Sequence, residues 1–227
     1  MFLNFTGILF FLISLIVAGI FKRKFAQYSQ INLKSNLSGR EVAAKMLADN
    51  GIYDVKVICK EGSLIDHYNP LDRTVNLSEG VYNGRSVASA AVAAHECGHA
   101  VQHAHEYVFL QFRSTLVPVT SAVSRFMPWI IFIGFILIRT STLPLEIGIV
   151  LFGITTLFTF VTLPVEFDAS RRALAWIDNN RIVDKQEHDM AKNALSWAAM
   201  TYVVAALGSL AELLRLILIV YNNRDRR

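Results

Sequence analysis

The chain has 227 residues, of which 53% are hydrophobic and 18% charged, with a formal net charge of +4. A soluble globular domain has about 25% charged residues, so the composition argues against a purely water-soluble protein and favours basic residues near anionic lipid. Nucleic acid is not an expected partner, because no basic run is interleaved with aromatic residues. The only cysteines, Cys59 and Cys97, do not resemble a secreted disulfide framework.

The first predicted element is an apolar, uncharged segment, residues 5–21, followed by Lys22, Arg23 and Lys24. Its length falls within the range of about 17–25 residues that spans a bilayer core. A cleaved signal peptide is the alternative, but signal peptides carry their positive charges before the apolar core. We therefore predict a retained transmembrane helix in residues 1–21. The positive-inside rule then places the following domain in the cytoplasm.

Residues 22–115 are predicted to form a small α+β catalytic part. Ser38 followed by Glu41 is typical of a capping box at a helix start. Apolar alternation and turn residues predict a three-stranded antiparallel sheet. The predicted strands lie at residues 54–58, 64–68 and 74–77. A long helix at about residues 86–106 is expected to follow the sheet.

The second apolar region, residues 116–164, is predicted to form a transmembrane hairpin with a break at residues 139–144. Its first arm reaches spanning length only if it starts near Leu116, with Arg125 snorkelling or facing protein. A hairpin returns the chain to the side that it left, so the flanking segments share a compartment. A helix and a polar loop are expected to follow at residues 165–190.

The last segment, residues 191–227, contains an apolar stretch interrupted by Glu212 and Arg215 and ends in a basic tail. These two residues are three positions apart on one helical face and can pair. Gly208 either lies within one membrane helix or divides the stretch into a helical hairpin or an interfacial pair of helices. A single span places the tail outside, against the positive-inside rule. The sequence therefore allows three or four spans.

The chemistry of the chain centres on His95-Glu96-Cys97-Gly98-His99, within the predicted helix at 86–106. Residues i and i+4 share a helix face, so both imidazoles can reach one Zn²⁺ at ~2.0–2.1 Å. Glu96 can then act as general base toward the metal-bound water. The alternative is a surface helix with incidental histidines. The small, apolar lead-in argues against it, because a buried helix does not carry such polar groups without partners.

Glu166 is the predicted third metal ligand. It follows the hairpin, on the same side as the helix of His95 and His99, and would complete a His₂Glu set with one position left for water. The alternative is that Glu166 pairs with Arg171 or caps a helix start after Pro164.

Two further histidines compete for the third position. His105 has the spacing of the metzincin pattern, but Gln102 stands where that pattern needs a glycine. His103 lies one turn beyond His99, and three side chains in a row on a straight helix cannot converge on one ion. We expect His103 either to contact the ligands without binding the ion itself, or to be a polar surface residue at the end of the helix. Asp168 is expected either to orient a ligating histidine or to be an ordinary carboxylate at a helix start.

With these residues the sequence resembles the YugP-type family of bacterial membrane zinc metallopeptidases. The resemblance rests on Asn76–Glu79, on Gly84–Ser86 with Val92–Gln102, and on Leu163–Ala173. It implies zinc ligands His95, His99 and Glu166 and a catalytic Glu96. The layout is similar to HtpX-type membrane proteases and to a small gluzincin core, where an Asp usually follows the glutamate ligand after four residues. Ser170 holds that position here.

The predicted fold is a mainly α membrane protein, with transmembrane helices and a small gluzincin-like α+β domain. The resemblance further implies that a sheet edge binds substrate. The candidate residues for this edge strand are Arg73, Thr74, Val75, Asn76 and Leu77. Candidates for a side-chain oxyanion donor are Tyr82, Tyr107, Arg171 and Arg172, and the sequence does not choose among them.

The expected function is peptide-bond hydrolysis by water activated on one Zn²⁺ per chain. The expected partners are the lipid bilayer and a protein or peptide substrate at or in the membrane. The expected location is the bacterial cell membrane, with the catalytic part in the cytoplasm. The alternatives are a zinc-binding membrane adaptor or chaperone-like protein without turnover, and a structural membrane protein with an accidental motif.

Overall fold

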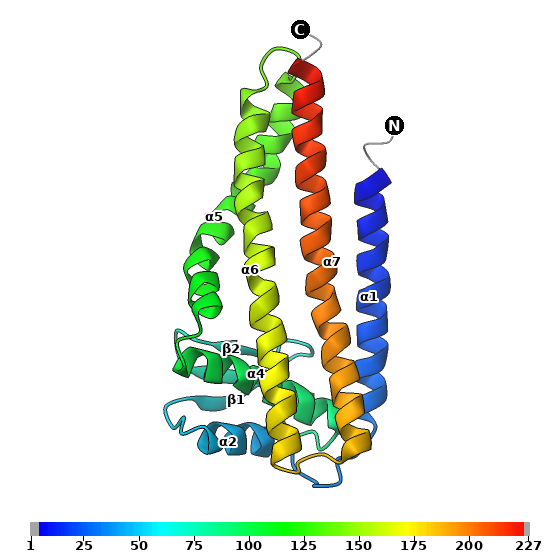
Figure 1. Cartoon of the computed structure of the whole chain (residues 1–227), viewed down its shortest axis with the longest axis vertical. Helices are drawn as coiled ribbons and strands as arrows, with labels where there is room; N and C mark the ends of the chain where they lie inside the picture. Colours follow the sequence, from blue (N-terminus) through cyan, green and yellow to red (C-terminus); the bar gives the residue numbers. More distant parts are fainter. Residues whose placement is uncertain (1–4, 225–227) are drawn as a thin grey trace. The chain divides into compact units, whose positions relative to one another are not determined.

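The computed structural model describes residues 5–224 (Figure 1). The basic tail beyond Arg224 lies outside the described residues. The helices and strands follow one another as α1 (Phe5–Ser29), α2 (Gly39–Asp49), β1 (Lys56–Lys60), β2 (His67–Asn69), β3 (Thr74–Ser78), α3 (Glu79–Tyr82), α4 (Val87–Ala104), α5 (Val108–Leu137), α6 (Leu143–Asn179) and α7 (Lys185–Arg224). The chain is therefore mainly helical, as predicted.

Two compact units share these elements. An apolar unit contains the chain up to Ile16, Phe112–Leu163 and the chain from Thr201 onward. An α+β unit contains Val17–Gln111 and Pro164–Met200. Four long helices, α1, α5, α6 and α7, contribute residues to both units.

Four helices in the described part of the chain, α1, α5, α6 and α7, are long and apolar enough to cross a membrane. Helix α7 continues through Gly208 without a break. Of the alternatives that the sequence left open, the structure therefore has a single helix and not a helical hairpin or a pair of helices. The helices also extend beyond the predicted spans. For example, α1 continues past Lys22–Lys24 to Ser29, because a bilayer limits the apolar span and not the helix.

Contacts within the apolar unit involve small and polar side chains. An added Cβ on Gly134 of α5 would lie 2.7 Å from the Leu145 Cα of α6, so the two backbones approach closely there. Thr159 of α6 and Ser209 of α7 hydrogen-bond through their hydroxyl groups at 3.1 Å. Arg215 Nε donates to Glu212 Oε2 at 2.7 Å, which confirms the predicted pair.

The α+β unit begins with the predicted capping box. Ser38 Oγ accepts the Glu41 N–H at 3.3 Å, while the Glu41 carboxylate accepts the Ser38 N–H at 2.7 Å. Helix α2 ends at Asp49, and Gly51 then takes a φ of +70°, which suits glycine. The apolar face of α2 packs against α4, and both helices lie beside the strands (Figure 1).

The sheet differs from the predicted antiparallel arrangement. Its strand order is β1-β3-β2, and β1 runs parallel to β3 while only β2 is antiparallel to it. The short turn between β2 and β3 makes these two strands a hairpin, and β1 pairs with the other edge of β3. Alternation predicts which segments are strands, but the partner of each strand is decided by packing against the helices.

The prediction that Arg73–Leu77 forms a substrate-binding edge strand is wrong. Most of this segment is β3, the central strand, which is buried along its whole length and paired on both sides. The edge strands are β1 and β2.

Helix α4 is the centre of the α+β unit. Ser86 caps it by accepting the Ser89 N–H at 3.1 Å, and its alanine-rich sequence permits close packing on several sides. An added Cβ on Gly98 would lie 2.6 Å from the Ala169 carbonyl oxygen of α6. This glycine therefore allows the segment of α6 after Pro164 to lie directly against α4.

Candidate metal centre

His95, His99 and Glu166 come together in the α+β unit. Their potential ligand atoms all lie within 4.8 Å of one another. The Glu166 Oε2 is 3.3 Å from His95 Nε2 and 3.7 Å from His99 Nε2. In the described part of the chain no other group of three potential ligands is assembled in this way.

The two helices explain this convergence. His95 and His99 are one turn apart on α4, with ring centroids at 4.8 Å and an interplanar angle of 80°. Glu166 lies on α6, three residues before Ala169, whose backbone touches Gly98. The close helix approach therefore brings a carboxylate from α6 against two imidazoles of α4.

The spacing of these atoms fits a zinc ion. In a tetrahedral site with bonds of about 2.0–2.1 Å, neighbouring ligand atoms lie about 3.3 Å apart. The two separations from Glu166 Oε2 are close to this value. Two imidazole nitrogens and one carboxylate oxygen also match the ligand type of zinc sites that keep one position open.

Glu96 lies beside this group and is held by the sheet. Its side chain is buried, and its Oε2 accepts the backbone N–H of Tyr68, in β2, at 3.0 Å. Burial raises the pKa of Glu96 to about 7; Glu166 and Asp66 raise this pKa further, while His95 and the Tyr68 N–H lower it. The carboxyl group of Glu96 therefore takes up or releases a proton easily near neutral pH.

The Nδ1 side of the His99 ring contacts Gln102. The His99 Nδ1 and Gln102 Oε1 are 3.0 Å apart. The Gln102 amide nitrogen donates to Val165 O at 2.8 Å and to Asp168 Oδ2 at 2.9 Å. Asp168 therefore reaches His99 through Gln102 and not directly.

Arginines fix the position of Asp168. Arg172 Nε donates to its Oδ2 at 2.5 Å, and Arg171 pairs with its other oxygen. Two of the four candidate oxyanion donors are therefore engaged with Asp168. The Arg172 guanidinium also lies over the ring of a third, Tyr107, at 5.9 Å. The fourth candidate, Tyr82, lies under Arg40 instead.

His95 has a partner in Ser170. The Ser170 hydroxyl lies 3.1 Å from His95 Nδ1. Ser170 is four residues after Glu166, so both side chains lie on one face of α6. Gln102 and Ser170 were not predicted as partners of His99 and His95. The i+3 spacing from His99 and the i+4 spacing from Glu166 are the signals that point to them.

His103 and His105 lie apart from the three converging atoms. His105 is the exposed C-cap of α4. His103 Nδ1 lies 2.7 Å from the Tyr68 hydroxyl, within hydrogen-bond distance. Burial raises the pKa of Tyr68 to about 12. His103 therefore touches the residue whose N–H holds Glu96 and not the ligands themselves.

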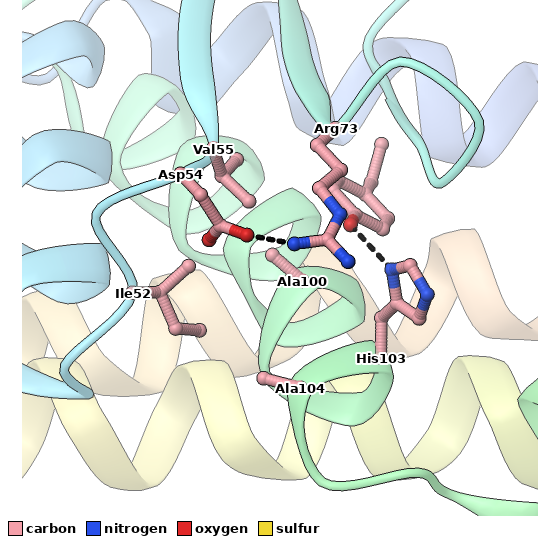
Figure 2. Close-up of a pocket in the computed structure, with 8 residues that line it drawn as sticks. Ile52, Asp54, Val55, Arg73, Ala100, His103 and Ala104 are labelled. Carbon is pink, nitrogen blue, oxygen red and sulfur yellow. Dashed lines mark hydrogen bonds and ion pairs between the residues drawn. The ribbon is translucent and has the colours of Figure 1, made fainter.

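The pair of Tyr68 and His103 borders a pocket of about 70 Å³ (Figure 2). Figure 2 shows an ion pair between Asp54 and Arg73 on one side and alanines of α4 below. The pocket is lined by Ile52, Asp54, Val55, Tyr68, Arg73, Ala100, His103 and Ala104. None of the three converging residues takes part in this lining.

Comparisons with known proteins give two matches. Residues 3–221 match the protein family described as "Putative neutral zinc metallopeptidase". The chain is also 43% identical over 204 residues, 90% of each of the two chains, to a protein named "Putative membrane protease YugP" from Bacillus subtilis (strain 168). No solved structure gives a significant match. The family match covers α4, the Glu166 segment and the four apolar helices, except for the last three residues of α7.

Proposed function

Because the chain belongs to this zinc metallopeptidase family, we propose that it is a membrane-embedded zinc metalloendopeptidase. In this proposal it hydrolyses peptide bonds of membrane-bound or membrane-proximal proteins and holds one Zn²⁺ per chain. The observation that carries the proposal is the convergence of His95, His99 and Glu166 beside the buried carboxylate of Glu96.

The side chains have separate roles in the proposed reaction. His95, His99 and Glu166 hold the zinc ion, which when bound polarises a carbonyl group and lowers the pKa of water. Glu96 is the general base. The Tyr68 N–H occupies its Oε2, so its Oε1 receives the proton from the attacking water. The same carboxyl group then delivers that proton to the leaving amine.

We propose β2, and not β3, as the strand that binds substrate. In a strand the N–H and C=O of one residue point to the same edge, and the Tyr68 N–H points away from β3 toward Glu96. The Tyr68 C=O therefore lies on the unpaired edge of the sheet, next to the catalytic carboxylate. An extended peptide that pairs with β2 would pass beside Glu96.

The proposed location is the bacterial cell membrane, with the α+β unit on the cytoplasmic side. If all four helices span the bilayer, the start of α1 and the end of α7 share one side, and the segments after α1 and between α6 and α7 share the other. Lys22, Arg23 and Lys24 follow the apolar part of α1 and favour the cytoplasm for the second group. Glu166 comes only three residues after Leu163, the last residue of the Phe112–Leu163 segment of the apolar unit. This short separation from an apolar segment favours substrates at the membrane surface.

The proposal is tested with full-length protein purified in detergent. We expect about one zinc per chain in the wild type and in Glu96→Gln, with peptide cleavage reduced about 10²–10⁴-fold in the variant. His105→Ala, at an exposed position outside the site, is the matched control and should cleave like the wild type. A wild-type chain without zinc contradicts the proposal. A zinc-loaded chain whose cleavage does not depend on Glu96 removes this residue from the mechanism.

A further inference from the structure

Gln102 is a fully buried amide on α4, with 0% of its surface exposed. Burying an amide in a protein interior is unfavourable unless its donors and acceptor are hydrogen-bonded. All of the polar atoms of this side chain have partners, and these partners come from the two helices that carry the converging ligands.

The partners determine which way the amide points. Val165 O and an oxygen of the Asp168 carboxylate lie at 2.8 and 2.9 Å from one end of the amide. Both are acceptors, so this end must be the NH₂ group. The carbonyl end, Oε1, then faces His99 Nδ1 at 3.0 Å.

This orientation determines the proton on His99. A carbonyl oxygen only accepts, so Nδ1 must carry the N–H that donates to it. A neutral imidazole has a single N–H, so Nε2 is left with its lone pair. That nitrogen is the one that lies 3.7 Å from Glu166 Oε2. The amide thus prepares His99 to bind a metal through Nε2.

The same side chain also fixes α6. Val165 and Asp168 lie on either side of Glu166 in the sequence, and the NH₂ group of Gln102 donates to both. Arg172 Nε donates to the same Asp168 oxygen, Oδ2, at 2.5 Å, and Arg171 pairs with the other oxygen. One amide therefore connects the turn that carries His99 with the turn that carries Glu166.

From these contacts we infer that Gln102 is a positioning residue of the metal centre. It fixes the tautomer of His99 and the distance between His99 and Glu166, and Asp168 acts on the centre only through it. This inference rests on the proposed function, because it assumes that the converging residues bind zinc.

The test measures zinc loss from the zinc-loaded, full-length protein after addition of excess chelator. Partners behind a metal ligand typically change metal affinity by 10–100-fold, so we expect Gln102→Met to lose zinc roughly 10–100 times faster than the wild type. Cys97→Ala is the matched control, because Cys97 is also fully buried on α4 but hydrogen-bonds only to Ala43 O. This control should lose zinc at the wild-type rate, with circular dichroism showing that both variants are folded.

A second pair of variants exchanges the amide of Gln102 and the carboxylate of Asp168, which distinguishes the loss of this hydrogen bond from a general effect on folding. Gln102→Glu places two carboxylates side by side and should accelerate zinc loss. Adding Asp168→Asn supplies an amide donor to the new carboxylate, so the double variant should retain zinc longer than Gln102→Glu alone. Nitrogen-15 spectra of the wild type should show the proton of His99 on Nδ1 and zinc on Nε2.

The outcomes separate the two proposals. A wild type that binds no zinc contradicts the proposed function. A zinc-binding wild type contradicts the inference in three cases: if Gln102→Met loses zinc no faster than Cys97→Ala, if the double variant is no slower than Gln102→Glu, or if zinc sits on His99 Nδ1.

Discussion

The backbone N–H of Tyr68 donates to Glu96 Oε2 at 3.0 Å and thereby joins the edge strand β2 to the proposed catalytic carboxylate. This contact fixes one oxygen of Glu96 and leaves the other for proton transfer. It also sets the distance between the base and the proposed substrate-binding edge. Because the donor is a backbone group, its contribution can be separated from that of the side chain.

We predict that Tyr68→Pro cleaves peptide about 10–100-fold more slowly than Tyr68→Ala, since a hydrogen bond to a charged group contributes about 1.5–3 kcal/mol. Both variants lose the ring and its contact with His103, but only proline loses the N–H. Proline is tolerated in an edge strand where the N–H points away from the sheet. The measurement is kcat/KM at full zinc occupancy. Equal values for the two variants would show that the N–H does not support Glu96.

Glu166 is predicted to be required for zinc binding. Glu166→Ala removes one of three ligands and should lower zinc content in dialysed protein from about one per chain to a small fraction. His103→Ala and His105→Ala should keep the wild-type content, because neither side chain is part of the converging group. Metal analysis of the three variants decides this. Zinc lost from His105→Ala but kept in Glu166→Ala would favour a metzincin-like site.

The sequence predicts the parts of the molecule whose signals are local. The capping box of Ser38 and Glu41, the apolar helices and the i, i+4 spacing of His95 and His99 all depend on residues within a few positions. Strand order is different, because β1 pairs with β3 through packing that alternation does not encode. The prediction of an edge strand at Arg73–Leu77 failed for this reason.

The contacts that support the site could not be predicted from the sequence either. Gln102 and Asp168 are 66 residues apart, and Tyr68 and Glu96 are 28 apart. Each of these side chains also has a plausible local role, such as helix surface or strand packing. The close approach of α4 and α6 at Gly98 brings Gln102 to Asp168, and the packing of β2 against α4 brings the Tyr68 N–H to Glu96.

Ser170 is predicted to stabilise the metal centre through His95. Its hydroxyl is 3.1 Å from His95 Nδ1, and loss of such a partner should weaken zinc binding roughly 10-fold in Ser170→Ala. Ser89→Ala is a suitable control, because Ser89 is a buried serine near the start of α4, away from the ligands. Competition with a chelator of known affinity gives the comparison. Unchanged zinc affinity in Ser170→Ala would mean that the contact is only structural.

Zinc removal is predicted to destabilise the α+β unit. A ligand present at 1,000 times its Kd stabilises the folded state by about 4 kcal/mol. In a chain of this size that free energy corresponds to roughly 8–16 °C in Tm. Chelation should therefore lower the Tm of the wild type by about this amount. Glu166→Ala should already melt at the lower temperature, and chelator should not shift it further. A chelator shift of equal size in this variant would assign the stabilising metal to another site.

The side of the membrane that carries the α+β unit can be tested with its own cysteines. Cys59 is exposed on β1 and Cys97 is buried in α4, so a membrane-impermeant maleimide should label a single site. If the unit is cytoplasmic, intact cells should show no labelling of Cys59, and permeabilised cells should show full labelling. Ser141→Cys in a Cys59→Ala background provides the opposite control. Ser141 lies in the link between α5 and α6, which is on the outer side in the proposed orientation. Labelling of Cys59 in intact cells, with Ser141→Cys protected, would invert the proposed orientation.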